Sequence, residues 1–113
     1  MSQIRVIRTT PFNRSAKRLA KKYPSVGLEV DRFVECLLHG ETPGDQIPGV
    51  NYPVYKVRIA SRDMRRGKQG GFGLIYYVST STAIYLIEIY AKSNQDNYPA
   101  ERLSQIIKEI QGE

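Results

Sequence analysis

Three strand-like segments follow one another in the second half of the chain, and their succession constrains the fold more than any other feature. Apolar and polar side chains alternate strictly over residues 54–61, which places them on opposite faces of a strand. Residues 72–78 are apolar on both faces, as is typical of a central strand. Residues 83–91 form a third segment after a short polar turn, so the sequence predicts neighbouring antiparallel strands.

The first half is predicted to be helical after a short strand at residues 4–9. Pro11 suits the first turn of a helix that has Thr10 as its N-cap. A second helix is predicted to start after Ser25, its N-cap, and to end at Gly40. Because the connection between the two helices is short, we expect them to pack as an antiparallel hairpin. A last helix is predicted after Pro99, with an apolar side made of Leu103, Ile106, Ile107 and Ile110.

The resulting order, βααβββα, predicts an α+β fold with a mostly antiparallel twisted sheet. Helices are expected on one face of this sheet, with the helical hairpin packed there. Residues 40–53 contain several Gly and Pro and are predicted to be a loop between the helical and the stranded half. We expect a single domain, residues 1–113, because a chain of this length suffices for one core and hardly for two.

The basic side chains are concentrated in two segments. Residues 1–22 contain seven basic side chains and no acidic one, and residues 56–68 contain six with Asp63 as the only acid. The formal net charge of the chain is +6. Such an excess favours a polyanion such as nucleic acid, or an acidic protein, as the partner.

Several classes of protein are disfavoured by what the sequence lacks. Cys36 is the only cysteine, which excludes an intrachain disulfide and fits the reducing cytoplasm. No apolar run approaches the roughly 20 residues of a membrane helix and no signal-peptide pattern opens the chain, so we expect a cytoplasmic protein without membrane contact. His39 is the only histidine, and Asp31 and Glu35 have no third ligand near them in sequence. We therefore expect neither a histidine pair, nor a metal, nor a cofactor.

The polar side of the segment at residues 54–61 is the positive indication of a site. Lys56 and Arg58 are two residues apart and project from the same side of a strand. The basic character continues in the following loop, and such a group of cations suits phosphates. Alternatively, these are solvated charges on the wet face of an antiparallel sheet. The loop cations are Arg62, Arg65, Arg66 and Lys68.

Tyrosines are abundant around these cations, and aromatic rings stack on nucleic-acid bases. Packing in the core or at the edge of the sheet is the alternative for most of them. The tyrosines concerned are Tyr76, Tyr77, Tyr85, Tyr90 and Tyr98.

Nearly the whole chain resembles one family in the order and spacing of its motifs. These are YKVRIAS at residues 55–61, GKQGGFGLIYY at 67–77 and IYAKS at 89–93. GDQIPG at residues 44–49 and the pattern of Phe, Lys, Leu, Lys and Tyr over 12–23 also fit. Together they resemble the RelE/HigB-like toxins, of the RelE/ParE superfamily, from bacterial type II toxin–antitoxin modules.

The resemblance implies a metal-independent endoribonuclease that cuts mRNA in the ribosomal A site. A cognate antitoxin would hold it inactive, and operator DNA would be bound only through the antitoxin complex. Arg58, Lys92 and Tyr98 match catalytic positions of the family. Lys56, Arg62, Arg65, Arg66 and Lys68 are expected to bind RNA.

Gly73 departs from the family pattern, because the resemblance implies an arginine there that holds the scissile phosphate. Loss of one such donor typically costs about 2.7–4 kcal/mol of transition-state stabilisation. Three interpretations are open: an attenuated variant (natural or selected to escape toxicity), a site that uses Arg62, Arg65 or Lys68 instead, or binding without cleavage. If position 73 shares a wet face with Arg58, we expect an arginine there to be accepted at little cost in stability.

The mechanism implied needs no protein nucleophile, because the RNA 2′-hydroxyl attacks the adjacent phosphate and leaves a 2′,3′-cyclic product. Arg58 would neutralise the developing charge. Lys92 and Tyr98 would assist proton transfer or the leaving group if neighbouring cations lower their pKa values. For Tyr98, packing against the following helix is the alternative.

Two other functions are compatible with the sequence. One is a ParE-like toxin that acts on DNA gyrase, which the absence of arginine at Gly73 mildly favours. The other is a non-catalytic nucleic-acid-binding protein that uses the basic face of the helix at residues 14–22.

Overall fold

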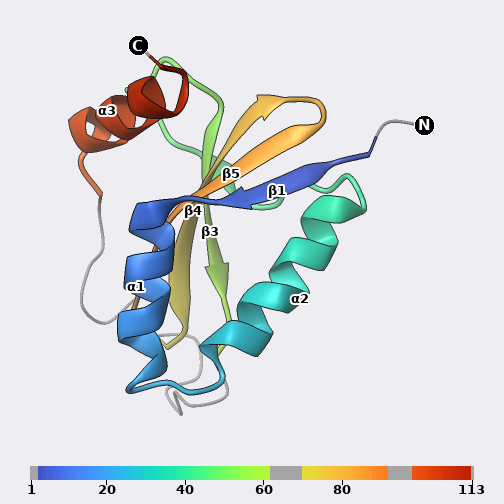
Figure 1. Ribbon diagram of the computed structural model, residues 1–113, viewed down its shortest axis with the longest axis vertical. Coiled ribbons are helices and arrows are strands. Elements are labelled where there is room, and N and C mark those ends of the chain that lie inside the picture. Colours follow the sequence, from blue (N-terminus) through green and yellow to red (C-terminus); the bar gives the residue numbers. More distant parts are fainter. Residues whose placement is uncertain (1–2, 62–69, 92–97, 113) are drawn as a thin grey trace.

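The computed structural model describes residues 3–61, 70–91 and 98–112 of the 113-residue chain. Helices and strands form an α+β arrangement, as predicted (Figure 1). None of the helices in these ranges has the length and apolar character needed to cross a membrane. The elements are β1 (Arg5–Arg8), α1 (Thr10–Ala20), α2 (Val26–Leu38), β2 (Asp45–Gln46), β3 (Val54–Ile59), β4 (Phe72–Thr80), β5 (Ala83–Ala91) and α3 (Ala100–Ile110).

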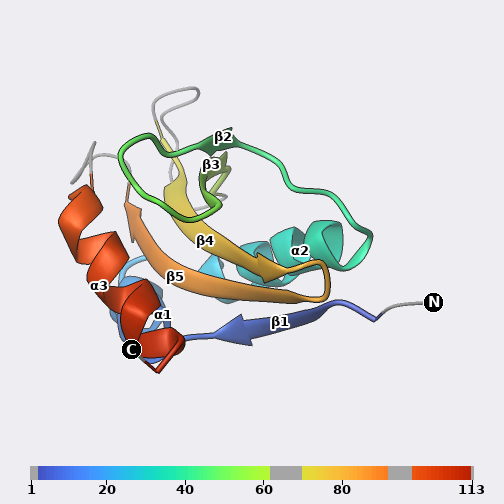
Figure 2. The ribbon, with the colours of Figure 1, turned by 90° about the horizontal axis from the view of Figure 1, so that it is seen from above.

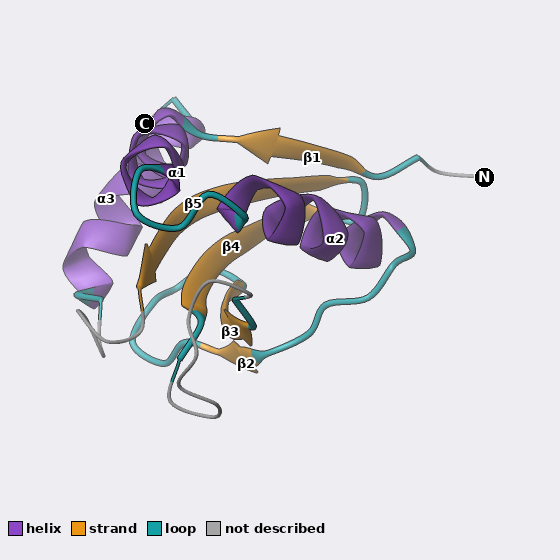
Figure 3. Ribbon diagram, turned by 90° about the horizontal axis from the view of Figure 1, so that it is seen from below, coloured by secondary structure: helices purple, strands orange, loops and turns teal. Residues whose placement is uncertain are grey.

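The strands form one open sheet in the order β1-β5-β4-β3-β2. β1 pairs with β5 in parallel, and the other three pairings are antiparallel, so the prediction of a mostly antiparallel sheet is confirmed. β2 was not predicted: it lies within residues 40–53, which the sequence analysis assigned to a loop. Figure 3 shows β2 beside β3 at the edge of the sheet opposite to β1. Its two residues are too few to show an alternating pattern.

The start of α1 differs from the prediction by one residue. Thr9, not Thr10, is the N-cap, and its hydroxyl oxygen accepts a hydrogen bond from the backbone N–H of Phe12 (3.3 Å). The same hydroxyl donates to the backbone carbonyl of Leu86 (2.8 Å). Pro11 lies in the first turn, as predicted. This one threonine therefore ends β1, starts α1 and ties both to β5.

Helices cover both faces of the sheet, which corrects the prediction of helices on one face. α1 and α2 run in opposite directions and share one core with side chains of β4 and β5, so the predicted hairpin is present on that face (Figure 1). α3 packs on the opposite face, where Leu103, Ile106 and Ile107 contact a second core that includes Ile75 and Tyr77 of β4 (Figure 2). A strand that is apolar on both faces requires cover on both.

Candidate functional site

One row of side chains crosses the three central strands on the α3 face of the sheet. Arg58 of β3 pairs with Gly73 of β4, and Gly73 pairs in turn with Tyr90 of β5. Tyr55, Val57 and Ile59 point to the opposite face and pack against the core under α1 and α2, as the alternation predicts. The register therefore places position 73 directly beside Arg58.

Tyr90 fills the space above Gly73. A β-carbon built on Gly73 would lie 2.4 Å from Cζ and 2.6 Å from the hydroxyl oxygen of Tyr90. Gly73 is buried, and the side chain of Tyr90 is 7% exposed. The expectation that position 73 lies on a solvent-exposed face is therefore wrong, and the small stability cost expected for an arginine there stays a prediction. An arginine there requires the ring of Tyr90 to move.

A pocket of about 310 Å³ opens beside this row. Lys56, which is half-buried, and Arg58, which is exposed, supply its positive charge. Asp45 of β2 also lines the pocket and is the cross-strand partner of Lys56. The short β2 strand thus closes one side of the pocket and brings a carboxylate to it, while Gly73 and Tyr90 line its wall.

A second pocket of about 440 Å³ shares Asp45 and Lys56 with the first and is also lined by Tyr98. The structure therefore places Lys56 between Arg58 and Tyr98 along two adjoining pockets. Cations beside a phenol form a surface that suits a phosphate and its attached sugar or base. Asp45, the cross-strand partner of Lys56, would repel a phosphate, so the more favourable position for that group is at Arg58.

Tyr98 stands just before α3 and is half-buried. Its hydroxyl donates a hydrogen bond to Oε2 of Glu88 on β5 (3.3 Å). Burial raises the pKa of Tyr98, the charge of Glu88 raises it further, and Arg102 opposes the shift. The sequence-based condition, a pKa of Tyr98 lowered by cations, is therefore not met. At neutral pH this phenol is a hydrogen-bond donor and not a base.

The remaining predicted site residues lie outside the described part of the chain. Residues 62–69 and 92–97 are not described. The catalytic role predicted for Lys92, and the RNA contacts predicted for the loop, stay predictions. The loop residues concerned are Arg62, Arg65, Arg66 and Lys68.

Three residues of this region were not assigned a site role by sequence reasoning. Asp45 lies in a segment predicted to be a loop, and Glu88 lies in a strand predicted only from its apolar residues. Tyr90 was considered for base stacking, but its contact with Gly73 was not foreseen. A glycine within a central strand is itself an indication that another group approaches the backbone there.

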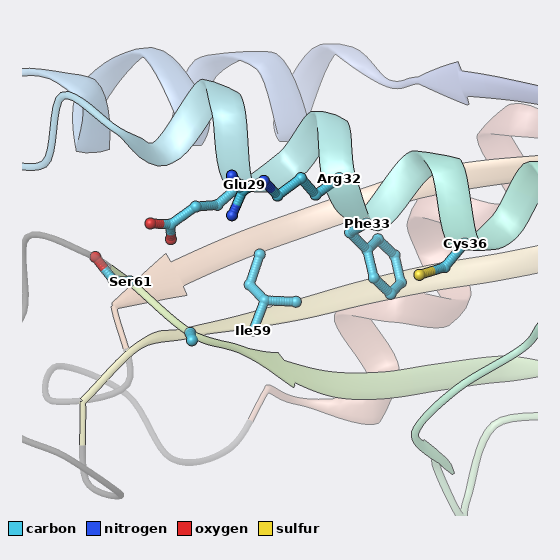
Figure 4. Close-up of a pocket in the computed structure, with 7 residues that line it drawn as sticks. Glu29, Arg32, Phe33, Cys36, Ile59 and Ser61 are labelled. Carbon is cyan, nitrogen blue, oxygen red and sulfur yellow. The ribbon is translucent and has the colours of Figure 1, made fainter.

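A cavity on the other face has a different chemistry. Side chains of α2 face the end of β3 across a mostly apolar pocket of about 390 Å³ (Figure 4). Glu29 lies at one end near Ser61, and Phe33 and Ile59 form the apolar middle. Glu29 is 8% exposed, and its Oε1 accepts a hydrogen bond from the hydroxyl of Ser25 (3.1 Å). A buried carboxylate in apolar surroundings does not suit a phosphate.

Among the described residues, no three His, Cys, Asp or Glu side chains gather as a metal site would require. A comparison of the chain with models of protein families and with curated proteins finds no match. The two pockets that contain Lys56, together with the motifs of the sequence, are therefore the basis for assigning a function.

Proposed function

We propose that this chain is a RelE-like toxin of a bacterial type II toxin–antitoxin module, acting in the cytoplasm as a ribosome-dependent mRNA endoribonuclease. The observation that carries the proposal is the alignment of Arg58, Lys56 and Tyr98 along two adjoining pockets. These are three of the positions at which the motifs resemble functional residues of such toxins. Tyr98 is far in sequence from Lys56 and Arg58 of β3, yet it lines a pocket together with Lys56.

The chemistry proposed uses groups that this surface contains. The 2′-oxygen of the RNA attacks the adjacent phosphorus and loses its proton to water, while the bond from phosphorus to the 5′-oxygen breaks and that oxygen takes up a proton from water. A 2′,3′-cyclic phosphate and a 5′-hydroxyl result. Arg58 stabilises the charge that develops on the phosphate, and Lys56 holds the chain of the RNA. The hydroxyl of Tyr98 donates its hydrogen bond to Glu88, so its oxygen accepts a hydrogen bond from a ribose hydroxyl and orients the sugar for attack.

The partners follow from the same proposal. The ribosome presents mRNA to the pockets, and a cognate antitoxin neutralises the toxin. The toxin contacts operator DNA only as part of its complex with the antitoxin. The loop at residues 62–68, with four basic side chains and one acid, favours an acidic antitoxin segment.

The test is cleavage of mRNA on programmed ribosomes, with the cut ends mapped by primer extension. We expect wild-type protein to cut in the A-site codon and Arg58→Ala to lose about 10²–10³ of the rate. Arg14→Ala removes an exposed cation from α1 and is the matched control, with an unchanged rate. Wild-type protein without cleavage, or Arg58→Ala as active as wild type, would contradict the proposal.

One observation favours a second candidate, a protein that binds without cutting. Tyr90 occupies the space in which the resemblance implies an arginine, so the pocket has one cation fewer than that pattern. A ParE-like gyrase inhibitor and a non-catalytic nucleic-acid-binding protein both fit this difference. Induction of DNA damage with translation intact would favour the gyrase inhibitor. Salt-dependent RNA binding without cleavage would favour the binding protein.

A further inference from the structure

A bulge in β5 sets the direction of Glu88. Tyr76 of β4 pairs with Leu86, but the next residue, Ile75, pairs with Glu88, so Ile87 is an extra residue in β5. In a regular ladder Glu88 would lie opposite Leu74, which belongs to the core under α1 and α2. A carboxylate among those apolar side chains would carry a large desolvation penalty. The bulge instead turns Glu88 to the face that carries α3.

On that face Glu88 is fixed by two hydrogen bonds. Its Oε1 accepts from the backbone N–H of Ile89 (3.0 Å), and its Oε2 accepts from the hydroxyl of Tyr98 (3.3 Å). The backbone contact holds the carboxylate, and the carboxylate in turn holds the phenol. Glu88 does not line either of the two pockets that contain Lys56. Its hydrogen bond to Tyr98 connects it to them, and it also lines a separate cavity with Ser15 and Arg18 of α1.

We infer that Glu88 is a positioning residue, which accepts the hydrogen bond of the Tyr98 hydroxyl and thereby holds the phenol oxygen at the pocket of Lys56 as an acceptor for a ribose hydroxyl of RNA. The inference rests on the proposed function, since it assigns Glu88 a part in the same site. The side chain of Tyr98, on the short segment before a helix, has several rotamers available. The hydrogen bond to the carboxylate of Glu88 favours one of these rotamers. The bulge explains why an acidic residue is available there.

The first test measures the contact without RNA. Tyrosine labelled with ¹³C at Cζ gives one NMR signal per ring, and the signal absent in Tyr98→Phe identifies Tyr98. The charged groups around it are Glu88 on β5, Arg102 on α3, and Lys56 and Asp45 in the adjoining pocket. We expect the titration midpoint of Tyr98 to fall in Glu88→Gln, because the carboxylate that opposes ionisation of the phenol is gone. Glu35→Gln on α2 is the control, with an unchanged midpoint.

The second test uses cleavage on ribosomes. Glu88→Gln is expected to lower kcat by about 10- to 100-fold with little change in KM, because a misplaced phenol oxygen leaves the ribose poorly oriented in the transition state without weakening binding. The double variant Glu88→Gln/Tyr98→Phe should lose no more than Tyr98→Phe alone, since Glu88 acts through the phenol. Circular dichroism and urea unfolding establish that each variant folds.

The outcomes separate this inference from the proposed function. An unchanged midpoint for Tyr98 in Glu88→Gln overturns the inference, whatever the cleavage rate. Cleavage by Glu88→Gln at the wild-type rate, while Tyr98→Phe is impaired, also overturns it. Wild-type protein that does not cleave overturns the proposed function, and the role of Glu88 in cleavage falls with it. Both are supported if Glu88→Gln lowers the titration midpoint of Tyr98 and also lowers kcat, while the double variant loses no more activity than Tyr98→Phe alone.

Discussion

The ring of Tyr90 covers Gly73 so closely that a β-carbon on the glycine would lie 2.4 Å from Cζ of the tyrosine. The two residues are cross-strand partners in β4 and β5. Glycine in a strand interior weakens it, because it has no side chain to pack and loses much conformational freedom on folding. An aromatic ring from the neighbouring strand compensates by covering the bare backbone. Gly73 and Tyr90 are thus one packing unit beside Arg58.

Gly73→Ala tests this unit by adding a single methyl group. We expect it to lower the free energy of unfolding by about 1–3 kcal/mol, the typical effect of overpacking. In a Tyr90→Ala background the same change should be neutral or stabilising, because the ring is absent. Urea unfolding of the four proteins gives the coupling energy. Equal costs in both backgrounds would contradict the packing unit.

Gly73→Arg tests whether the contact between Gly73 and Tyr90 limits mRNA cleavage. Alone, the variant is expected to be destabilised, since the arginine and the present position of the Tyr90 ring exclude each other. Combined with Tyr90→Ala it should fold stably and place a second guanidinium next to Arg58. If the proposed chemistry holds, cleavage by this double variant rises about 10²-fold above wild type. Tyr90→Ala alone is the control; an equal rise there would assign the gain to loss of the ring.

Local patterns in the sequence predicted most of the fold and part of the site. The alternation of residues 54–61 placed Lys56 and Arg58 on one face, and the structure confirms that placement. Contacts that depend on register were not predictable from one strand at a time. The bulge at Ile87 changes the face of Glu88, and the pairing of Gly73 with Tyr90 joins residues far apart in sequence. The side on which α3 packs also depends on tertiary context, because its apolar stripe fits either face.

Salt dependence of RNA binding identifies which cations contact phosphate. Lys56→Ala and Arg58→Ala are each expected to reduce the slope of log K against log salt by about 0.7, the value for one phosphate contact on a single strand. Fluorescence anisotropy with a short single-stranded RNA between 50 and 250 mM KCl measures it. Arg14→Ala, on α1, should leave the slope unchanged. A reduced slope for Arg14→Ala alone would move the RNA to the helical basic face.

The chemistry of the nucleophile gives a test that does not depend on any protein variant. Replacing the 2′-hydroxyl by hydrogen at the cleaved nucleotide should abolish cleavage, because the attacking group is removed. Chelation of trace transition metals should leave cleavage intact, provided that free Mg²⁺ for the ribosome is held constant. Loss of activity on chelation, with rescue by Mn²⁺ or Zn²⁺, would contradict a metal-independent mechanism.

Tyr76 links β4 to the loop that precedes β2, and it makes stability sensitive to high pH. Its hydroxyl donates to the backbone carbonyl of Pro43, and its ring stacks on Tyr55 with centroids 5.4 Å apart. Burial raises the pKa of Tyr76 well above its ordinary value, and the neighbouring Tyr55 adds to the shift. Tyr76→Phe should cost about 1 kcal/mol at pH 7, the typical loss for one hydrogen bond.

The pH dependence of that cost has a definite sign. In the unfolded chain Tyr76 loses its proton at about pH 10, whereas in the folded protein it stays protonated at higher pH. Stability from this group is therefore complete below pH 10 and is lost as the pH rises further. The difference in unfolding free energy between wild type and Tyr76→Phe should shrink above pH 10 by up to about 1.4 kcal/mol per pH unit. Ile75→Val changes the core on the same strand without a titrating group, so its unfolding free energy should differ from that of wild type by the same amount at every pH. A difference for Tyr76→Phe that is also independent of pH would contradict the raised pKa of Tyr76.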